Sequence, residues 1–222
     1  MVSVRPPEYF PGLLYVALMD RVRYFVLADT FQYSRQSFQN RTRLRNSRKA
    51  QWITVPLEGG QHGRSQAATR IRTGTAWRRR HWKAFRYNYG RAPYFVHYEA
   101  PLVDFFEAEY ARLAEATCAS VRLIHRLFGL DTVLSRATDM QGQPDAMASV
   151  LLPFPGRAVF LPPVAACIDR RLHTRIRAFE YTHPKYPQAF PGFVPGMTAL
   201  DLLFNCGPDS LAVLRQGISA PE

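Results

Sequence analysis

The apolar positions at the start of the chain predict a strand, a rigid loop, a helix and a second strand, in that order. Residues 2–4 suit a short strand, and the three prolines of residues 5–11 allow neither a helix nor a regular ladder. Apolar residues recur at helical spacing over residues 13–18, and residues 24–28 form a continuous apolar run before Asp29. Such a run is typical of a buried strand, so the chain begins like an α/β unit.

Later segments continue this alternation. Residues 75–88 are predicted to form a helix with aromatic residues on one side and bases over most of the rest. Residues 102–128 carry apolar residues spaced by threes and fours, which predicts one long helix that Gly129 ends. Residues 33–49 show no clear period. The other expected elements are strands over residues 51–57, 132–134, 158–161 and 176–180 and a short helix over residues 198–206.

The order of these elements predicts an α/β fold with a mostly parallel sheet flanked by helices. The chain has no internal repeat and no linker long enough to divide it, and its 222 residues with 47% hydrophobic content suit one sizeable core. We therefore expect a single domain over residues 1–222, with a basic segment at residues 35–91 and a short tail at residues 216–222.

Basic residues are concentrated in one quarter of the chain. Residues 35–91 contain fifteen Lys and Arg residues and one acid, Glu58, which gives this segment a charge of +14. The other fourteen bases and sixteen acids sum to −2, so the net charge of +12 comes entirely from this segment. Such an excess predicts an anionic partner: nucleic acid, an anionic surface or a phosphorylated small substrate. The alternative is a basic surface without a dedicated partner.

The cysteines and the apolar runs argue against several classes of protein. Cys118, Cys167 and Cys206 are odd in number and widely spaced, which fits neither a disulfide framework nor a zinc site. The apolar runs are short and interrupted by proline, so we expect no membrane span. The first residues do not resemble a secretory leader. A cytoplasmic protein without a metal is the simplest expectation.

Several polar positions are candidates for a site. Asp29 follows a buried strand, where open α/β sheets bind ligands, although a turn or cap role fits equally. Residues 33–49 interleave Gln, Asn, Ser and Arg with aromatic residues, which suits phosphates and ring systems and also a solvated loop. The glycine-rich residues 58–65 lack phosphate-loop spacing and are expected to form a flexible connection or a lid, with His62 a loop residue.

The helix predicted at residues 75–88 offers a basic face and a histidine. Its bases are candidates for phosphate or nucleic-acid contacts. His81 can act as a general base or a phosphate ligand, although a histidine beside a tryptophan is more often a packing residue.

A proline-stiffened loop presents His183, Tyr186 and Gln188. Rigid loops of this kind hold active-site groups in position. In the next helix Thr198 and Asp201 have capping-box spacing, so we expect Asp201 to be a cap, with catalysis as the alternative.

Seven short blocks of the sequence form a recognisable set. The blocks are Tyr9-Phe10-Pro11, Gln36-Ser37-Phe38-Gln39-Asn40-Arg41, Trp52-Ile53-Thr54-Val55-Pro56, His81-Trp82-Lys83, Ala92-Pro93-Tyr94-Phe95, His183-Pro184-Lys185-Tyr186-Pro187-Gln188 and Asp201-Leu202-Leu203-Phe204-Asn205-Cys206-Gly207. They occur in order over residues 9–207, cover nearly the whole chain and resemble the WbqC-like family.

Members of that family occur in gene clusters for O-antigen, other surface polysaccharides and natural products, so the resemblance implies a tailoring role of the transferase type. The family's opening pattern is similar to nucleotidyltransferases and other nucleotide-binding, Rossmann-like folds. Relatives usually carry His-Gln where this chain has Arg5 and Pro6, and a Ser-Gly-rich turn where it has Phe160-Leu161-Pro162-Pro163. Arginine cannot act as a base but can hold a phosphate or carboxylate. The departures imply a specialised member with an altered substrate or donor, or one impaired in catalysis.

The leading hypothesis is a transferase that modifies an amine or hydroxyl of an amino sugar or secondary metabolite. Its donor would be an activated acyl or aminoacyl compound, and an aminoacyl-tRNA would also account for the basic segment. The catalytic candidates are His183, His81, Asp29 and Tyr186. The substrate-binding candidates are Arg5, Tyr9, Gln39, Asn40, Arg41, Gln188 and Asn205, and the candidates for phosphate or nucleic acid are Arg43, Arg78, Arg79, Arg80 and Lys83.

Two alternatives belong to other classes. A nucleotidyltransferase-like or sugar-nucleotide enzyme would bind a nucleoside triphosphate, usually with magnesium, for which only Asp29 is obviously placed. A non-catalytic protein that binds RNA or another partner is favoured by the missing histidine.

Overall fold

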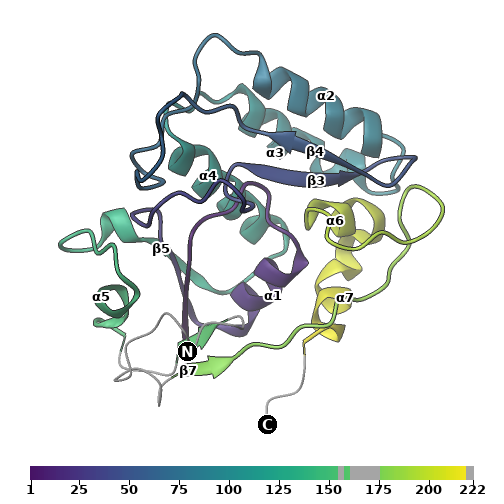
Figure 1. Ribbon diagram of the computed structural model, residues 1–222. Coiled ribbons are helices and arrows are strands. Elements are labelled where there is room, and N and C mark those ends of the chain that lie inside the picture. Colours follow the sequence, from purple (N-terminus) through teal and green to yellow (C-terminus); the bar gives the residue numbers. More distant parts are fainter. Residues whose placement is uncertain (155–157, 161–175, 219–222) are drawn as a thin grey trace.

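A computed structural model describes residues 1–154, 158–160 and 176–218. Its centre is a five-stranded sheet in which every neighbouring pair is parallel (Figure 1). The strands, in spatial order, are β5 (Val133–Arg136), β2 (Tyr24–Leu27), β1 (Val2–Arg5), β6 (Ala158–Phe160) and β7 (Ile176–Ala178). The α/β class and the mostly parallel sheet predicted from the sequence are confirmed.

The strand order changes direction at β1. The chain passes from β1 through helix α1 (Leu13–Arg21) to β2 on one side, whereas β6, much later in the sequence, pairs with β1 on the other side. Open α/β sheets bind ligands outside the carboxyl ends of their strands at such a point. Arg5 is the last residue of β1 and so lies at this position.

A separate antiparallel hairpin consists of β3 (Arg41–Arg45) and β4 (Ala50–Thr54) and lies in the upper half of Figure 1. The absence of a period in residues 33–49 did not reveal this hairpin. In β3, Thr42 and Leu44 are buried between the half-buried Arg41 and Arg43, but one of the two is polar, and Arg45 at the end of the strand is also buried. Hydrophobicity alone does not reveal that alternation.

The hairpin packs against helix α2 (Trp77–Tyr89), which the sequence predicted. Helix α2 packs against α3 (Phe95–Glu107), which in turn packs against α4 (Leu113–Leu127). The single helix predicted over residues 102–128 is wrong. Glu115 accepts the backbone N–H groups of Ala111 and Arg112, which begins a new helix at this point. Gly129, with φ of 62°, ends α4 as expected.

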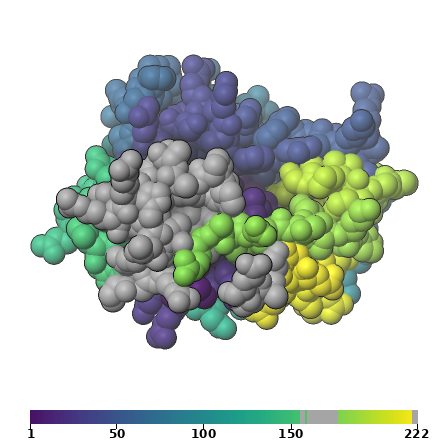
Figure 2. Space-filling model, turned by 60° about the horizontal axis from the view of Figure 1, so that its bottom comes forward, coloured from purple at the N-terminus to yellow at the C-terminus, as the bar shows by residue number. Residues whose placement is uncertain are grey.

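The C-terminal part of the chain consists of short helices and the segment that connects them to the sheet. Short helices α5 (Met147–Leu151), α6 (Leu200–Cys206) and α7 (Ser210–Gln216) complete the fold, with 3-10 turns at Ala137–Asp139 and Gly207–Asp209. Figure 2 shows the green segment after β7 running to the yellow helices. The Thr182 N–H donates to the Gly217 carbonyl at 2.8 Å and so joins the two segments.

The main hydrophobic core contains residues from Tyr9 to Leu214, and a smaller cluster joins β1, β2 and α5. In the part of the chain that the structure describes, no helix combines the length and the apolar character that crossing a membrane requires. Leu161, Pro162, Pro163 and Cys167, which the sequence analysis singled out, lie outside the described residues.

Candidate functional site

A pocket beside the hairpin gathers arginine side chains from segments that are separate in sequence. Its volume is about 570 Å³. Arg35 comes from the loop before β3, Arg41 begins β3, and Arg72 lies before α2. We term this cavity the arginine pocket; its lining consists of Tyr33, Arg35, Asn40, Arg41, residues 54–62 and Arg72.

The arginine pocket carries an excess of positive charge. No acid of the described chain pairs with Arg35, Arg41 or Arg72, and Glu58 is the only acid in the lining. Burial raises the pKa of Tyr33, and the positive charges of Arg35 and Arg41 oppose that shift. Both guanidinium groups therefore act on the same phenol. The pocket offers several charged donors and an aromatic ring to an anionic ligand.

Residues 36–41, one of the seven blocks named in the sequence, help to shape this pocket. The Gln39 side-chain oxygen accepts the Ser34 N–H at 3.0 Å. Asn40 donates through Nδ2 to the Val55 carbonyl at 3.1 Å, and the Val55 N–H donates back to the Asn40 carbonyl at 2.7 Å. The two predicted substrate-binding amides are therefore buried: Gln39 bridges positions within its own loop, and Asn40 joins the loop to the residue after β4 and also lines the pocket. A second cavity of about 400 Å³ shares Tyr33, Arg35 and His62 with the arginine pocket and extends it toward residues 32–36.

Asp29 lies at the carboxyl end of β2, as predicted, but it is completely buried. Arg136, at the end of the adjacent β5, donates to its Oδ2 atom through Nε and Nη2 at 2.9 and 2.7 Å. Thr138 donates to the same carboxylate through its backbone N–H at 3.0 Å and its hydroxyl at 2.7 Å. Both oxygens already have partners, so Asp29 joins two strand ends.

Arg5 and Glu8 form an ion pair at the point where the strand order changes direction, with 3.1 Å between Arg5 Nη2 and Glu8 Oε1. Burial raises the pKa of Glu8, and the charge of Arg5 opposes that shift. The Nε atom of Arg5 is buried and has no hydrogen-bond partner among the described residues. A titratable carboxyl group therefore lies beside Arg5 at the end of β1.

One loop connects this sheet edge with the arginine pocket. Gln61 and His62 line the pocket. Farther along the loop, Gln66 donates through Nε2 to the Pro7 carbonyl at 2.8 Å, and the Ala67 N–H donates to the Asp29 carbonyl at 2.8 Å. The two regions are therefore neighbours.

His81, a predicted base, is a buried residue with only 6% of its surface exposed. Its Nδ1 atom lies 2.9 Å from the hydroxyl of Tyr9, itself a predicted substrate contact and completely buried. Burial lowers the pKa of His81 to about 4, although a hydrogen bond with the Thr54 backbone opposes the shift. His81 is therefore neutral near pH 7 and links α2 to the N-terminal loop.

His183 is half-buried in the proline-stiffened loop, and both of its ring nitrogens have partners. The Gly196 N–H donates to Nε2 at 3.3 Å, and Nδ1 lies 2.9 Å from the Pro184 carbonyl. Because a backbone N–H can only donate, Nε2 carries the lone pair and Nδ1 the proton. The ring also stacks on Tyr186, with 6.2 Å between the centroids. The loop therefore holds one imidazole tautomer in place.

Asp201 anchors this loop and is not the helix cap that its spacing suggested. Tyr186 and Gln188 donate to its Oδ2 atom at 2.7 and 2.8 Å, and no side chain caps α6. Burial raises the pKa of Asp201 although these two hydrogen bonds oppose the shift. The buried Arg45 donates to Gln188 Oε1 at 3.2 Å, and Asn205 donates to the Asp201 backbone carbonyl at 2.6 Å. The predicted residues Tyr186, Gln188 and Asn205 thus belong to one buried network.

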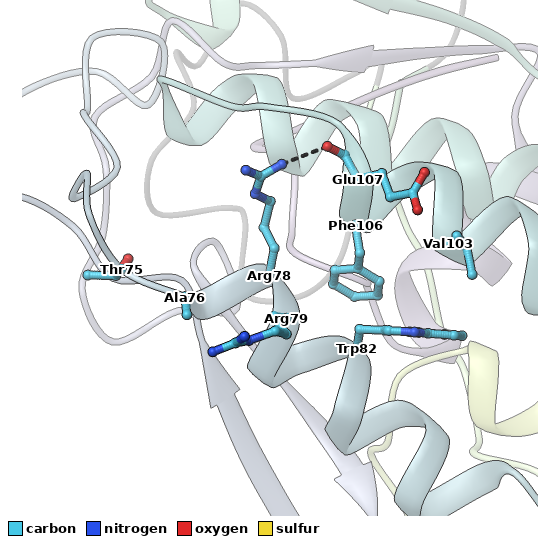
Figure 3. Close-up of a pocket in the computed structure, with 8 residues that line it drawn as sticks. All are labelled: Thr75, Ala76, Arg78, Arg79, Trp82, Val103, Phe106 and Glu107. Carbon is cyan, nitrogen blue, oxygen red and sulfur yellow. Dashed lines mark hydrogen bonds between the residues drawn. The ribbon is translucent and has the colours of Figure 1, made fainter.

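The bases of α2 divide into two groups. Arg78 donates to the Glu107 carbonyl at 2.8 Å and ties α2 to the end of α3, as Figure 3 shows. The groove between these helices has a volume of about 480 Å³ and an apolar side formed by Trp82, Val103 and Phe106, with Arg79 at its edge. Arg79, Arg80 and Lys83 are exposed and make no ion pair within the described chain.

The site candidates predicted from the sequence did not include Arg35, Arg72, Glu8 or Arg136, although Arg35 and Arg72 belong to the basic segment from which an anionic partner was predicted. Their charges are evident in the sequence, but the groups that they contact depend on how distant loops and strands pack. For Arg136 the only signal was its position just after a predicted strand. Among the residues described, no three His, Cys, Asp or Glu side chains are grouped closely enough to hold a metal ion.

Comparison with known proteins identifies relatives along almost the whole chain. The model of the WbqC-like protein family matches residues 6–213. The chain is also 29% identical over 230 positions to the uncharacterized protein Rv1507c of Mycobacterium tuberculosis (strain ATCC 25618 / H37Rv), and the match covers 97% of this chain and 99% of that protein. No solved structure matches the chain.

Proposed function

The chain belongs to the WbqC-like protein family, and we propose that it is a transferase that binds a phosphate-bearing ligand in the arginine pocket. The observation that carries this proposal is the composition of the pocket lining. Two signature blocks contribute to it through Asn40 and Arg41 and through residues 54–56, next to arginines that lack an acidic partner. The proposal therefore rests on residues of the family-like blocks lying beside arginine donors that suit an anion.

The fold supports a nucleotide-linked ligand. A parallel sheet whose strand order changes direction is the arrangement found in Rossmann-like and nucleotidyltransferase-like proteins. The arginine pocket is joined to that edge of the sheet by residues 61–67. We therefore favour a donor that joins an acyl or aminoacyl group to a phosphate, a nucleotide or a tRNA, with an amine or hydroxyl of an amino sugar or secondary metabolite as the acceptor.

His183 is the best candidate for the base. Its Nε2 lone pair accepts only a long hydrogen bond from the Gly196 N–H, whereas His81 is buried and its Nδ1 atom lies 2.9 Å from the Tyr9 hydroxyl. In the proposed reaction the acceptor nitrogen or oxygen forms a bond to the acyl carbon, and the bond from that carbon to the donor oxygen breaks. The acceptor proton passes to His183 Nε2 and then to the departing oxygen.

Thermal-shift screening against nucleotides, sugar nucleotides and bulk tRNA tests the pocket. A ligand at about 100 times its Kd stabilises a protein by about 2.7 kcal/mol, which raises the Tm by roughly 5–10 °C at this size. We expect the double change Arg35→Ala and Arg72→Ala to remove most of that shift. Arg91→Ala, an exposed residue of the same basic segment outside the pocket, should leave it intact.

Measuring turnover with the ligand found in this screen tests the role of His183 as the base. His183→Ala should abolish activity while the Tm shift by the ligand persists. An unchanged ligand shift in the double arginine variant would remove the pocket from the proposal, and full activity of His183→Ala would remove the base. Stabilisation by nucleoside triphosphates that requires magnesium, with none by acyl or aminoacyl donors, would favour the nucleotidyltransferase-like alternative.

A further inference from the structure

The outer face of the hairpin carries an exposed tryptophan between two arginines. In the register of the hairpin Arg43 pairs with Trp52 and Arg41 with Thr54, so both arginines and the indole share one face. The guanidinium carbons of Arg41 and Arg43 lie 4.7 and 5.7 Å from the centroid of the Trp52 ring. The Phe38 ring extends the group, at 5.5 Å from the indole. We term these four residues the hairpin face.

The exposure of these aromatic rings does not result from a loosely packed hairpin. Trp52 is 47% exposed and Phe38 is 39% exposed. On the opposite face Thr42, Leu44 and Ile53 are buried against the core, which fixes the register. The packing of the opposite face therefore keeps the indole ring at the surface, where about half of Trp52 remains open to solvent.

The two arginines of the hairpin face have no acidic partner among the described residues. Arg41 donates through Nε to the Ser37 carbonyl at 3.2 Å, and no acid of the described chain pairs with Arg41 or Arg43. Two arginines separated by one residue on a strand lie about 7 Å apart, which is similar to the spacing of successive phosphates in an extended nucleic-acid strand. The face thus offers stacking surfaces and phosphate donors side by side.

We propose that the hairpin face binds single-stranded nucleic acid, with bases stacked on Trp52 and Phe38 and phosphates paired with Arg41 and Arg43. Exposed aromatic rings set among basic side chains are how proteins hold unpaired strands. A duplex keeps its bases stacked inside and would leave the rings without a partner. An acidic protein segment would satisfy the arginines but would supply no flat ring for the indole.

The position of the hairpin face connects this proposal to the proposed function. Arg41 also lines the arginine pocket. At the other end, Arg43 Nη1 lies 3.2 Å from where a Cβ atom on Gly196 would be, and the Gly196 N–H donates to His183. A bound strand would run between the pocket and His183. If the proposed function holds, the donor class is an RNA that carries its acyl group at a single-stranded end.

Fluorescence anisotropy with a labelled ten-nucleotide single-stranded RNA tests the hairpin face without any need for turnover. We expect Trp52→Ala to weaken binding by about 5- to 150-fold, the range for loss of one base–aromatic stack. Arg43→Gln should weaken binding and lower the slope of log affinity against log salt by about 0.7, because one phosphate contact is lost. The control Tyr87→Ala removes an aromatic ring that is 88% exposed on α2 and should change affinity less than twofold.

Circular dichroism and thermal melting show whether each variant is folded. If Trp52→Ala does not fold, Arg43→Gln still tests the proposal. Wild-type affinity in both variants would overturn the proposal. Equal binding of a duplex of the same length, or competition by poly-glutamate as strong as by unlabelled RNA, would also overturn it in favour of a general anion surface. The Arg35 and Arg72 variants test the pocket separately, because those residues lie outside the hairpin face.

Discussion

At the scale of single residues, His81 makes stability depend on pH in a defined direction. Burial lowers its pKa in the folded protein to about 4, from the ordinary value of 6.5. As the pH falls below 6.5 the unfolded chain takes up the proton first, so stability decreases until the pH nears 4. The full shift corresponds to about 3 kcal/mol. Urea unfolding between pH 7 and pH 4 should show this loss, and His81→Gln should reduce the slope, whereas an equally steep profile in that variant would contradict the assignment.

The same residues show how far single positions can be predicted. The sequence placed Asp29 at a strand end correctly, but the saturation of its carboxylate depends on Arg136 and Thr138, more than a hundred residues away. Spacing suggested that Asp201 caps a helix, but its carboxylate instead accepts hydrogen bonds from Tyr186 and Gln188 of a separate loop. Residue type and local position were readable, whereas partners from distant segments were not.

At the scale of elements, Glu115 separates α3 from α4. Its Oε2 atom accepts the N–H groups of Ala111 and Arg112 at 2.8 and 3.0 Å. Glu115→Ala should lower the free energy of unfolding by about 0.5–2 kcal/mol, as for other capping losses. Glu115→Gln keeps an acceptor and should cost less. In denaturant titrations Glu109→Ala, which removes only an exposed 3.6 Å ion pair with Arg78, is the matched control with little effect, and equal losses in all variants would argue against the cap.

The predicted element boundaries are wrong where two consecutive helices pack against the same core. Phe106, Tyr110 and Leu113 kept a helical spacing across the break because all three contact the same core, not because they lie on one helix. The hairpin was not predicted because its alternation is not one of hydrophobicity. Arginines occupy outward positions, and the inward positions include the polar Thr42. A period in hydrophobicity reports burial, and burial does not by itself identify the element.

At the scale of the whole molecule, the basic segment divides into parts with different roles. Arg45 and Arg78 bind backbone carbonyls and so stabilise the fold. Arg35, Arg41 and Arg72 line the arginine pocket, whereas Arg79 and Arg80 are exposed on α2 and are not part of its lining. The concentration of charge was evident from the sequence, but this division required the arrangement of β3, the loops and α2.

A pair of double variants with the same loss of charge tests that division. Arg79→Gln with Arg80→Gln should elute from heparin at lower salt than the wild type, because nonspecific anion binding follows total surface charge. At about 0.15 M salt the screening length is about 8 Å, so charges on α2 should contribute little to a ligand held in the pocket. The Tm shift by the pocket ligand should therefore persist in this variant and disappear in Arg35→Gln with Arg72→Gln. An equal loss of the Tm shift in both double variants would contradict this division. It would mean that the total positive charge of the protein, and not the geometry of the pocket, determines binding of the ligand.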